Sequence, residues 1–149
     1  MNNPPTPARR MRRPAAVIAL LATFLLLTGC LRPEQDQVLK ELNQDRTALR
    51  LKALPTQADA QRKAQAWAEK LARENTIYHS KLSDGIRTGW CSLGENVGYG
   101  PDVATIEDAY MESPGHKANI VAAKWNGVGV GHAKNGNRVF TVQVFITTC

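Results

Sequence analysis

Apolar side chains recur at helical spacing between residues 34 and 52, ahead of Pro55. A second stripe, made of alanines with Trp67 and Leu71, runs through a helix-favouring stretch between residues 56 and 77. A period of 3.6 residues places such side chains on one face of a helix. The pattern therefore predicts two amphipathic helices, with Trp67 in the core beneath the second.

Two shorter helices are predicted between residues 102 and 121. Asp102 is a good N-cap, and apolar residues follow it at helical spacing. The next helix begins in the sequence SPGHKANIV, where Ser113 is a favoured N-cap and Pro114 fits the first helical position. His116 then falls in the first turn, where free backbone N–H groups and the helix dipole disfavour imidazolium. We expect a neutral ring that can accept a proton or bind a metal.

The hydrophobic period changes after Trp125. Residues 127–132 alternate Gly and Val, residues 134–137 have turn chemistry, and residues 139–146 are rich in β-branched and aromatic side chains. This pattern predicts an antiparallel hairpin. Its glycines open no helix, so they do not form a nucleotide-binding fingerprint. Four helices and a late hairpin predict an α+β layered domain over residues 34–149.

Residues 79–100 follow neither period and contain five glycines. Structureless loops beyond about 12 to 15 residues are uncommon in compact domains and are usually functional or disordered. The composition of residues 93–100, LGENVGYG, indicates an ordered conformation rather than disorder. We interpret the segment as an ordered loop that helps to form a site.

The first 29 residues are organised like a secretory signal. Four arginines precede an almost entirely apolar run from Ala15 to Thr28, which is short for a membrane span. The sequence Leu27-Thr28-Gly29-Cys30 resembles the bacterial lipobox, in which the cysteine is lipidated and begins the mature protein. We expect residues 1–29 to be a lipoprotein signal peptide and residues 30–33 a lipidated tether. The alternative is an ordinary signal, or an uncleaved anchor, with an incidental Cys30.

Both alternatives place the rest of the chain outside the cytoplasm, and the lipobox implies a lipid anchor in a bacterial membrane. The net charge of +6 falls to +2 without residues 1–29, because 15 basic and 13 acidic residues remain. Much of the basicity thus lies in the targeting segment, and we expect no nucleic acid partner. Cys91 and Cys149 are an even pair in an oxidising compartment, which favours a disulfide over two unpaired thiols.

Four segments, in order, resemble the CAP superfamily, also called the SCP domain. They are Leu42–Arg46 with Leu54-Pro55, Ala64–Ala68 with Tyr78-His79-Ser80, Gly94-Glu95-Asn96-Val97, and Ser113–Ile120. The third matches the family's GEN signature and the fourth its bacterial SPGHRxNI motif; their order is specific, whereas GEN alone is not. The resemblance implies an α-β-α sandwich of about four helices around a small antiparallel sheet.

The resemblance also implies a central cleft lined by two histidines and two acidic residues. By position these include His79, His116 and Glu95, which come from three separate segments. Two imidazoles and a carboxylate would form an open site for zinc or another divalent cation. No local ligand motif such as HExxH supports a metal, so this expectation rests on the resemblance.

The second acidic residue of the cleft is less well defined. The family pattern places it three residues after an aromatic in the third helix, but that offset from Tyr110 falls on Ser113. Glu112 is the nearest acid, one residue early, and Glu107 lies one helical turn before Tyr110. We favour Glu112 and keep Glu107 as the alternative.

Three functions are compatible with these residues. We favour non-catalytic binding of a metal, a lipid or sterol, or another envelope ligand, since family members have been linked to lipid or sterol binding and to interactions at cell surfaces. A hydrolase would use a histidine as general base and a serine or metal-bound water as nucleophile. Ser80 and Ser113 adjoin the histidines, but capping already explains Ser113. The third alternative is a structural envelope protein with a vestigial cleft.

Overall fold

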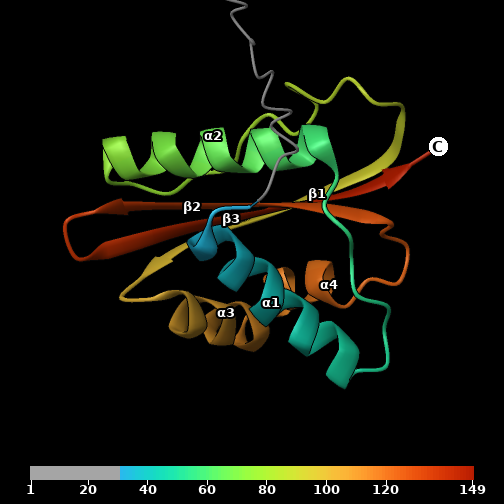
Figure 1. The fold of residues 1–149 in the computed structure, drawn as a ribbon, viewed down its shortest axis with the longest axis horizontal. Coiled ribbons are helices and arrows are strands. Elements are labelled where there is room, and N and C mark those ends of the chain that lie inside the picture. The colour runs from blue at the N-terminus through green and yellow to red at the C-terminus, as the bar shows by residue number, and fades with distance from the viewer. Residues whose placement is uncertain (1–30) are drawn as a thin grey trace, which may run out of the picture. The chain divides into compact units, whose positions relative to one another are not determined.

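The computed structural model describes residues 31–149, so the predicted signal peptide and Cys30 lie outside the described residues. The elements are α1 (Pro33–Ala48), α2 (Ala58–Glu74), β1 (Trp90–Gly100), α3 (Val103–Glu112), α4 (Pro114–Ile120), β2 (Gly127–Asn135) and β3 (Arg138–Thr148). The strands form an antiparallel sheet in the order β1-β3-β2. α2 covers one face of the sheet, and α1, α3 and α4 cover the other (Figure 1). The expected α-β-α sandwich is confirmed.

The predicted helices and the terminal hairpin are present, with both long helices ending earlier than expected. α1 ends at Ala48 rather than Lys52, and α2 ends at Glu74, before Asn75 in the left-handed conformation. None of the helices in residues 31–149 is long and apolar enough to cross a membrane.

The prediction of a loop over residues 79–100 is wrong for its second half, which forms the edge strand β1. Its register with β3 ends at the pair Gly100↔Val139. A Cβ atom at Gly94 would lie 3.0 Å from the Trp125 ring, and one at Gly98 would lie 2.8 Å from the Tyr110 ring. Glycine lets these large side chains pack directly on the strand. It also removes the apolar alternation by which a strand is predicted.

Two apolar cores bury both faces of the sheet. The core beneath α2 contains Ala60, Ala64, Ala68, Leu71, Ala72, Val97, Phe140, Val142, Val144 and Ile146. The core on the other face contains Val38, Leu42, Leu54, Val103, Ile106, Tyr110, Ile120, Trp125, Val128, Val130, Val139 and Phe145. Trp67, predicted in the core, is half-buried and packs against the edge of the first core.

Two polar residues of α1 form hydrogen bonds with the backbone of the α1–α2 connection and with the end of α4. The Asn43 amide donates to the Leu54 carbonyl (3.1 Å) and accepts from the Leu54 N–H (2.8 Å). Arg46 is only 1% exposed and donates to the carbonyls of Ile120 (2.6 Å) and Ala122 (3.0 Å). A cation at the end of α4 also offsets the partial negative charge there. The family motif in α1 therefore fixes the position of α4 and of His116.

Cys91 and Cys149 form the predicted disulfide, with their Cα atoms 5.5 Å apart. The bridge joins the start of β1 to the end of the chain, where the Cys149 N–H also donates to the Gly89 carbonyl (3.3 Å). On the chain-entropy model, a loop of this size contributes about 4 kcal/mol to stability. The disulfide thus fixes one end of the segment that carries His79.

α2 lies in direct backbone contact with β2. A Cβ atom at Gly129 would overlap the Ala60 backbone, and one at Gly131 would overlap the Ala64 carbonyl. Ala60 and Ala64 are fully buried. Only glycine permits so close an approach of two backbones, which explains the alternation of Gly and Val in β2.

Gly129→Ala should lower the free energy of unfolding by about 3 kcal/mol or more, because the added methyl group can be accommodated only by displacing α2. Urea unfolding followed by circular dichroism measures the loss. Gly89→Ala is the matched control, since no atom lies within 4 Å of its added Cβ. We expect the control to stay within about 0.5 kcal/mol of the wild type. Equal losses in the two variants would contradict the proposed backbone contact.

Candidate functional site

His79 and Glu95 form the centre of the candidate site. Glu95 is buried in β1, and its Oε1 accepts from His79 Nδ1 (2.9 Å) and from the Ser80 N–H (2.8 Å). Its Oε2 accepts from the Ser80 hydroxyl at 2.6 Å. The His79 side chain is 62% exposed. Glu95 therefore holds the imidazole through Nδ1 and leaves Nε2 available to a ligand.

His116 lies in the first turn of α4, and its ring centroid is 4.9 Å from that of Tyr110. Ser113 is the N-cap residue, but its side chain makes no capping hydrogen bond. The prediction that this hydroxyl caps the helix is wrong, because Ser113 Oγ lies 3.0 Å from His116 Nδ1 instead. Burial lowers the pKa of His116, and the nearby His79 lowers it further. The neutral ring agrees with expectation, although burial is its main cause.

A buried polar network connects the His116 backbone to Glu107 of α3. Asn96 of the GEN motif is fully buried and donates to the His116 carbonyl (3.1 Å) and to Gln143 Oε1 (2.9 Å). Gln143 donates in turn to Glu107 Oε2 (2.6 Å). Asn119 of α4 donates to Asn96 Oδ1 at 3.0 Å. The asparagine of GEN therefore positions α4, whereas the glutamate positions His79.

Of the two acids considered for the second position, the structure brings Glu107 into the His116 network. Glu112 is exposed at the end of α3, and its side chain makes no hydrogen bond or ion pair within residues 31–149. Glu107 is 4% exposed, and its Oε1 has no hydrogen-bond partner within that range. Its spacing from Val103 and Tyr110 places it on the apolar face of α3. That spacing is the sequence signal that could have identified it.

Burial raises the pKa of Glu107 to about 8, and the negative charge of Asp45 adds to the effect. Glu41 and Asp108 raise the pKa further, whereas the hydrogen bond from Gln143 opposes the shift. The carboxyl group is therefore mostly protonated at neutral pH. A neutral carboxyl group is far less costly to bury than a carboxylate.

The side chains do not fit a zinc site with three protein ligands. Both oxygens of Glu95 are occupied, and no three His, Cys, Asp or Glu side chains in the part of the chain that the structure describes are grouped to hold a metal ion. A carboxylate that orients a histidine is instead an outer partner of many metal sites. A cation would have only the imidazoles of His79 and His116 as direct ligands. Zinc binding stays a prediction.

An α-β-α sandwich, in which an edge strand orients one exposed histidine and anchors the helix of a second, defines a CAP-type domain. The family model for CAP, the cysteine-rich secretory protein family, matches residues 39–149. The chain therefore belongs to the CAP family.

Solved structures share this fold. An outer surface protein from Borrelia burgdorferi has a TM-score of 0.71 and 19% identity, over 78% of this chain and 93% of its own. An extracellular SCP-domain protein from Bacillus anthracis has a TM-score of 0.66 and 23% identity, and the match covers 81% of this chain but 45% of the Bacillus protein. The venom allergen-like protein 4 from Schistosoma mansoni has a TM-score of 0.63 and 15% identity, and the match covers 80% of this chain and 91% of the Schistosoma protein. A search of curated protein sequences found no significant match.

Glu107 should make the protein less stable as the pH rises from about 4.5 to about 8. Its pKa is higher in the folded state than its ordinary value of 4.5, so the folded state binds more protons across this range. The contribution of Glu107 to the free energy of unfolding is complete below pH 4.5 and is lost as the pH rises through about 8. The loss should reach a few kcal/mol, since each pKa unit corresponds to about 1.4 kcal/mol.

Denaturant unfolding of the wild type, Glu107→Gln and Glu112→Gln at pH 5 and pH 8 measures this contribution. The uncharged Glu107→Gln variant should show a much smaller loss between the two pH values. Glu112→Gln removes an exposed carboxylate of the same helix and should keep the wild-type pH dependence. The same pH dependence in all three proteins would show that Glu107 is ionised in the folded state.

Proposed function

We propose that this protein is an extracytoplasmic, membrane-anchored CAP lipoprotein that binds a ligand at His79, Glu95 and His116 without turning it over. The occupied carboxylate of Glu95 is the observation that carries the proposal. Its hydrogen bonds to His79 and Ser80 hold an exposed imidazole in one orientation, which is a positioning role for the carboxylate. A preoriented imidazole beside a second, neutral imidazole can donate to or accept from a polar ligand group, or hold a cation.

Two observations support the location. The lipobox-like sequence ends at Cys30, and the similar proteins from Borrelia and Bacillus are described as outer surface and extracellular. α1 begins at Pro33, so only Leu31 and Arg32 separate Cys30 from the helix. At about 3.5 Å per extended residue, a lipid on Cys30 would keep the domain within roughly 15 Å of the membrane.

The decisive experiment is mass spectrometry of the protein recovered from membranes of its own host. The intact mass should show the loss of residues 1–29 and acyl chains on Cys30, and native spectra should show a co-purified lipid, sterol or metal. The double variant His79→Ala, His116→Ala should lose the co-purified species. His132→Ala is the control, because this third histidine lies on β2.

An unmodified Cys30 would contradict the lipid anchor. The absence of any co-purified species, or its retention by the double variant, would contradict binding at the histidines. The two halves of the proposal are therefore tested separately.

The contact between Ser113 Oγ and His116 Nδ1 (3.0 Å) favours a second candidate, a serine hydrolase acting on envelope material. A hydroxyl hydrogen-bonded to a neutral imidazole is the arrangement of a nucleophile and its general base. Here His116 would take the hydroxyl proton as Ser113 Oγ attacks an acyl or phosphoryl centre.

A fluorophosphonate probe tests this candidate directly. If Ser113 is nucleophilic, its Oγ bonds to phosphorus, fluoride leaves, and His116 accepts the hydroxyl proton. Peptide mapping should then find the label on Ser113 and none in Ser113→Ala, with labelling at least tenfold slower in His116→Ala. Ser80→Ala should keep the label. An unlabelled Ser113 in the folded wild type would rule out this role.

A further inference from the structure

A cavity of about 630 Å³ lies between one side of α2 and the connection that follows this helix. Its lining residues are Arg62, Lys63, Ala66, Trp67, Lys70, Arg73, Ser80, Lys81, Asp84, Gly85 and Arg87. The volume is within the range of small-molecule sites, about 300 to 1,000 Å³. Ser80 also donates to Glu95, so this cationic pocket adjoins the histidine site without containing either histidine.

The charge of the domain is concentrated in this pocket. Six of the lining residues are basic and one, Asp84, is acidic. The other residues from 31 to 149 comprise nine basic and twelve acidic side chains, a net charge of −3. A concave surface with a single sign of charge focuses the electrostatic field and raises the local concentration of anions.

Three of the six cations already have partners within the domain. Lys63 donates to the carbonyls of Lys81 (2.8 Å) and Asp84 (3.0 Å), and burial lowers its pKa. Lys81 is 3.4 Å from the Asp84 carboxylate, and Arg62 pairs with Asp59. These contacts hold the loop wall of the pocket against α2.

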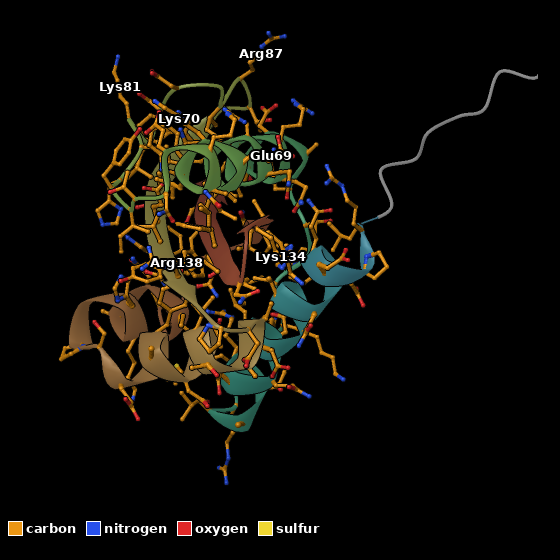
Figure 2. All side chains as sticks on the ribbon, turned by 90° about the vertical axis from the view of Figure 1, so that its left-hand side faces the viewer. Glu69, Lys70, Lys81, Arg87, Lys134 and Arg138 are labelled. Atoms are coloured by element: carbon orange, nitrogen blue, oxygen red, sulfur yellow. A yellow bond between two sulfur atoms is a disulfide. The ribbon has the colours of Figure 1, made fainter. Side chains whose placement is uncertain are left out.

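The other three cations, Lys70, Arg73 and Arg87, have no carboxylate within salt-bridge distance in residues 31–149. Lys70 Nζ lies over the aromatic rings of Trp67 (4.7 Å) and Tyr78 (5.5 Å). In Figure 2, Lys81 and Arg87 extend from the loop beyond α2, and Lys70 projects from α2 itself. The lining thus includes one ammonium and two guanidinium groups that no carboxylate in residues 31–149 compensates, together with the Trp67 ring.

The loop that carries Arg87 is ordered by side-chain contacts. Asp59 Oδ2 accepts from the N–H groups of Arg87 (2.9 Å) and Thr88 (2.8 Å) and from the Thr88 hydroxyl (2.8 Å). The Gln57 amide also donates to Thr88 Oγ1 at 2.9 Å. Binding an anion would therefore require little further ordering of the loop.

We propose that the cationic pocket binds a phosphate ester that carries an apolar group. A guanidinium group can donate two parallel hydrogen bonds to two oxygens of one phosphate. The three uncompensated cations supply the positive charge that balances the phosphate. Trp67, Ala66 and the methylene stems of the basic residues form the apolar surface beside them. This site is separate from the ligand proposed at His79 and His116, and it does not depend on the lipid anchor.

Calorimetry on the full-length protein in lauryl maltoside tests the site with hexyl phosphate, inorganic phosphate and hexanol. Hexyl phosphate should bind saturably and more weakly as salt is added. Inorganic phosphate should bind at least tenfold more weakly, and hexanol should not bind. Absence of saturable binding by hexyl phosphate, or equal affinity for inorganic phosphate, would overturn the proposal.

Paired charge variants assign the binding to this pocket. The double variant Lys70→Gln, Arg73→Gln should weaken hexyl phosphate binding at least tenfold. The single loop variant Arg87→Gln should weaken it severalfold without altering α2. Lys40→Gln, Lys134→Gln removes the same charge from exposed positions outside the pocket and should leave the affinity within twofold. Equal losses in the pocket and control pairs would show that only net charge matters and would overturn the site.

Competition experiments distinguish the sources of the phosphate. If phosphatidylglycerol in the micelles displaces hexyl phosphate and phosphatidylcholine does not, the result supports a membrane lipid as the ligand. Saturable binding of hexyl phosphate without such displacement supports a soluble ester. A single-stranded oligonucleotide that binds more tightly than hexyl phosphate, with the same loss in the pocket variants, would overturn the proposal in favour of a nucleic acid site.

Discussion

The contact between the backbones of α2 and β2 fixes the helix on which both the segment carrying His79 and the cationic pocket depend. Glycines in β2 and buried alanines in α2 allow it, and two glutamines of α2 complete it. Gln61 exchanges two hydrogen bonds with the Val130 backbone (2.7 and 2.9 Å), and Gln65 does the same with His132 (both 3.0 Å). Four residues of helix rise about 6 Å and two of strand about 6.7 Å, so the spacings match. The glutamines thus satisfy an edge strand that would otherwise be open to pairing with other chains.

With α2 fixed, its two ends determine the path of the segment that carries His79. Asn75 ends the helix, while Asp59 at the beginning of the helix binds the returning chain at Arg87 and Thr88. The disulfide then secures the start of β1. His79 lies between these attachment points, and Glu95 is the carboxylate it meets. The histidine is therefore positioned by contacts on both sides of it in the sequence.

Alternation along β1 explains why the GEN signature contains two different polar residues. Successive strand residues point to opposite faces, so Glu95 and Asn96 serve different layers. Glu95 faces the α2 side and holds His79, whereas Asn96 faces the α3 and α4 side and binds the His116 carbonyl. A single strand therefore connects two histidines that lie in different layers of the sandwich.

The sequence predicts those parts of the fold whose signal is local. The helices are predicted from the 3.6-residue period of apolar side chains. The hairpin is predicted from the alternation of Gly and Val and from the turn residues that follow it. β1 was missed because Gly94, Asn96 and Gly98 occupy the face where apolar side chains would mark a strand. Their size and polarity are set by Trp125, Tyr110 and the buried network, all of which are tertiary partners. Glu107 lies on the apolar face of α3, so its burial could have been predicted, but its connection to His116 through Gln143 could not.

The histidine site and the cationic pocket have a common requirement, which is the order of the chain between α2 and β1. Ser80 contributes to both, since it donates to Glu95 and lines the pocket. Lys63 of α2 holds the loop through its hydrogen bonds to the carbonyls of Lys81 and Asp84. Its ammonium group is partly buried, and losing these partners would be costly because a buried charge needs hydrogen bonds. Lys63 belongs to the same helix that rests on β2. The close packing of glycine and alanine at one side of α2 therefore also fixes the helix that carries Lys63 and one wall of the cationic pocket at its other side.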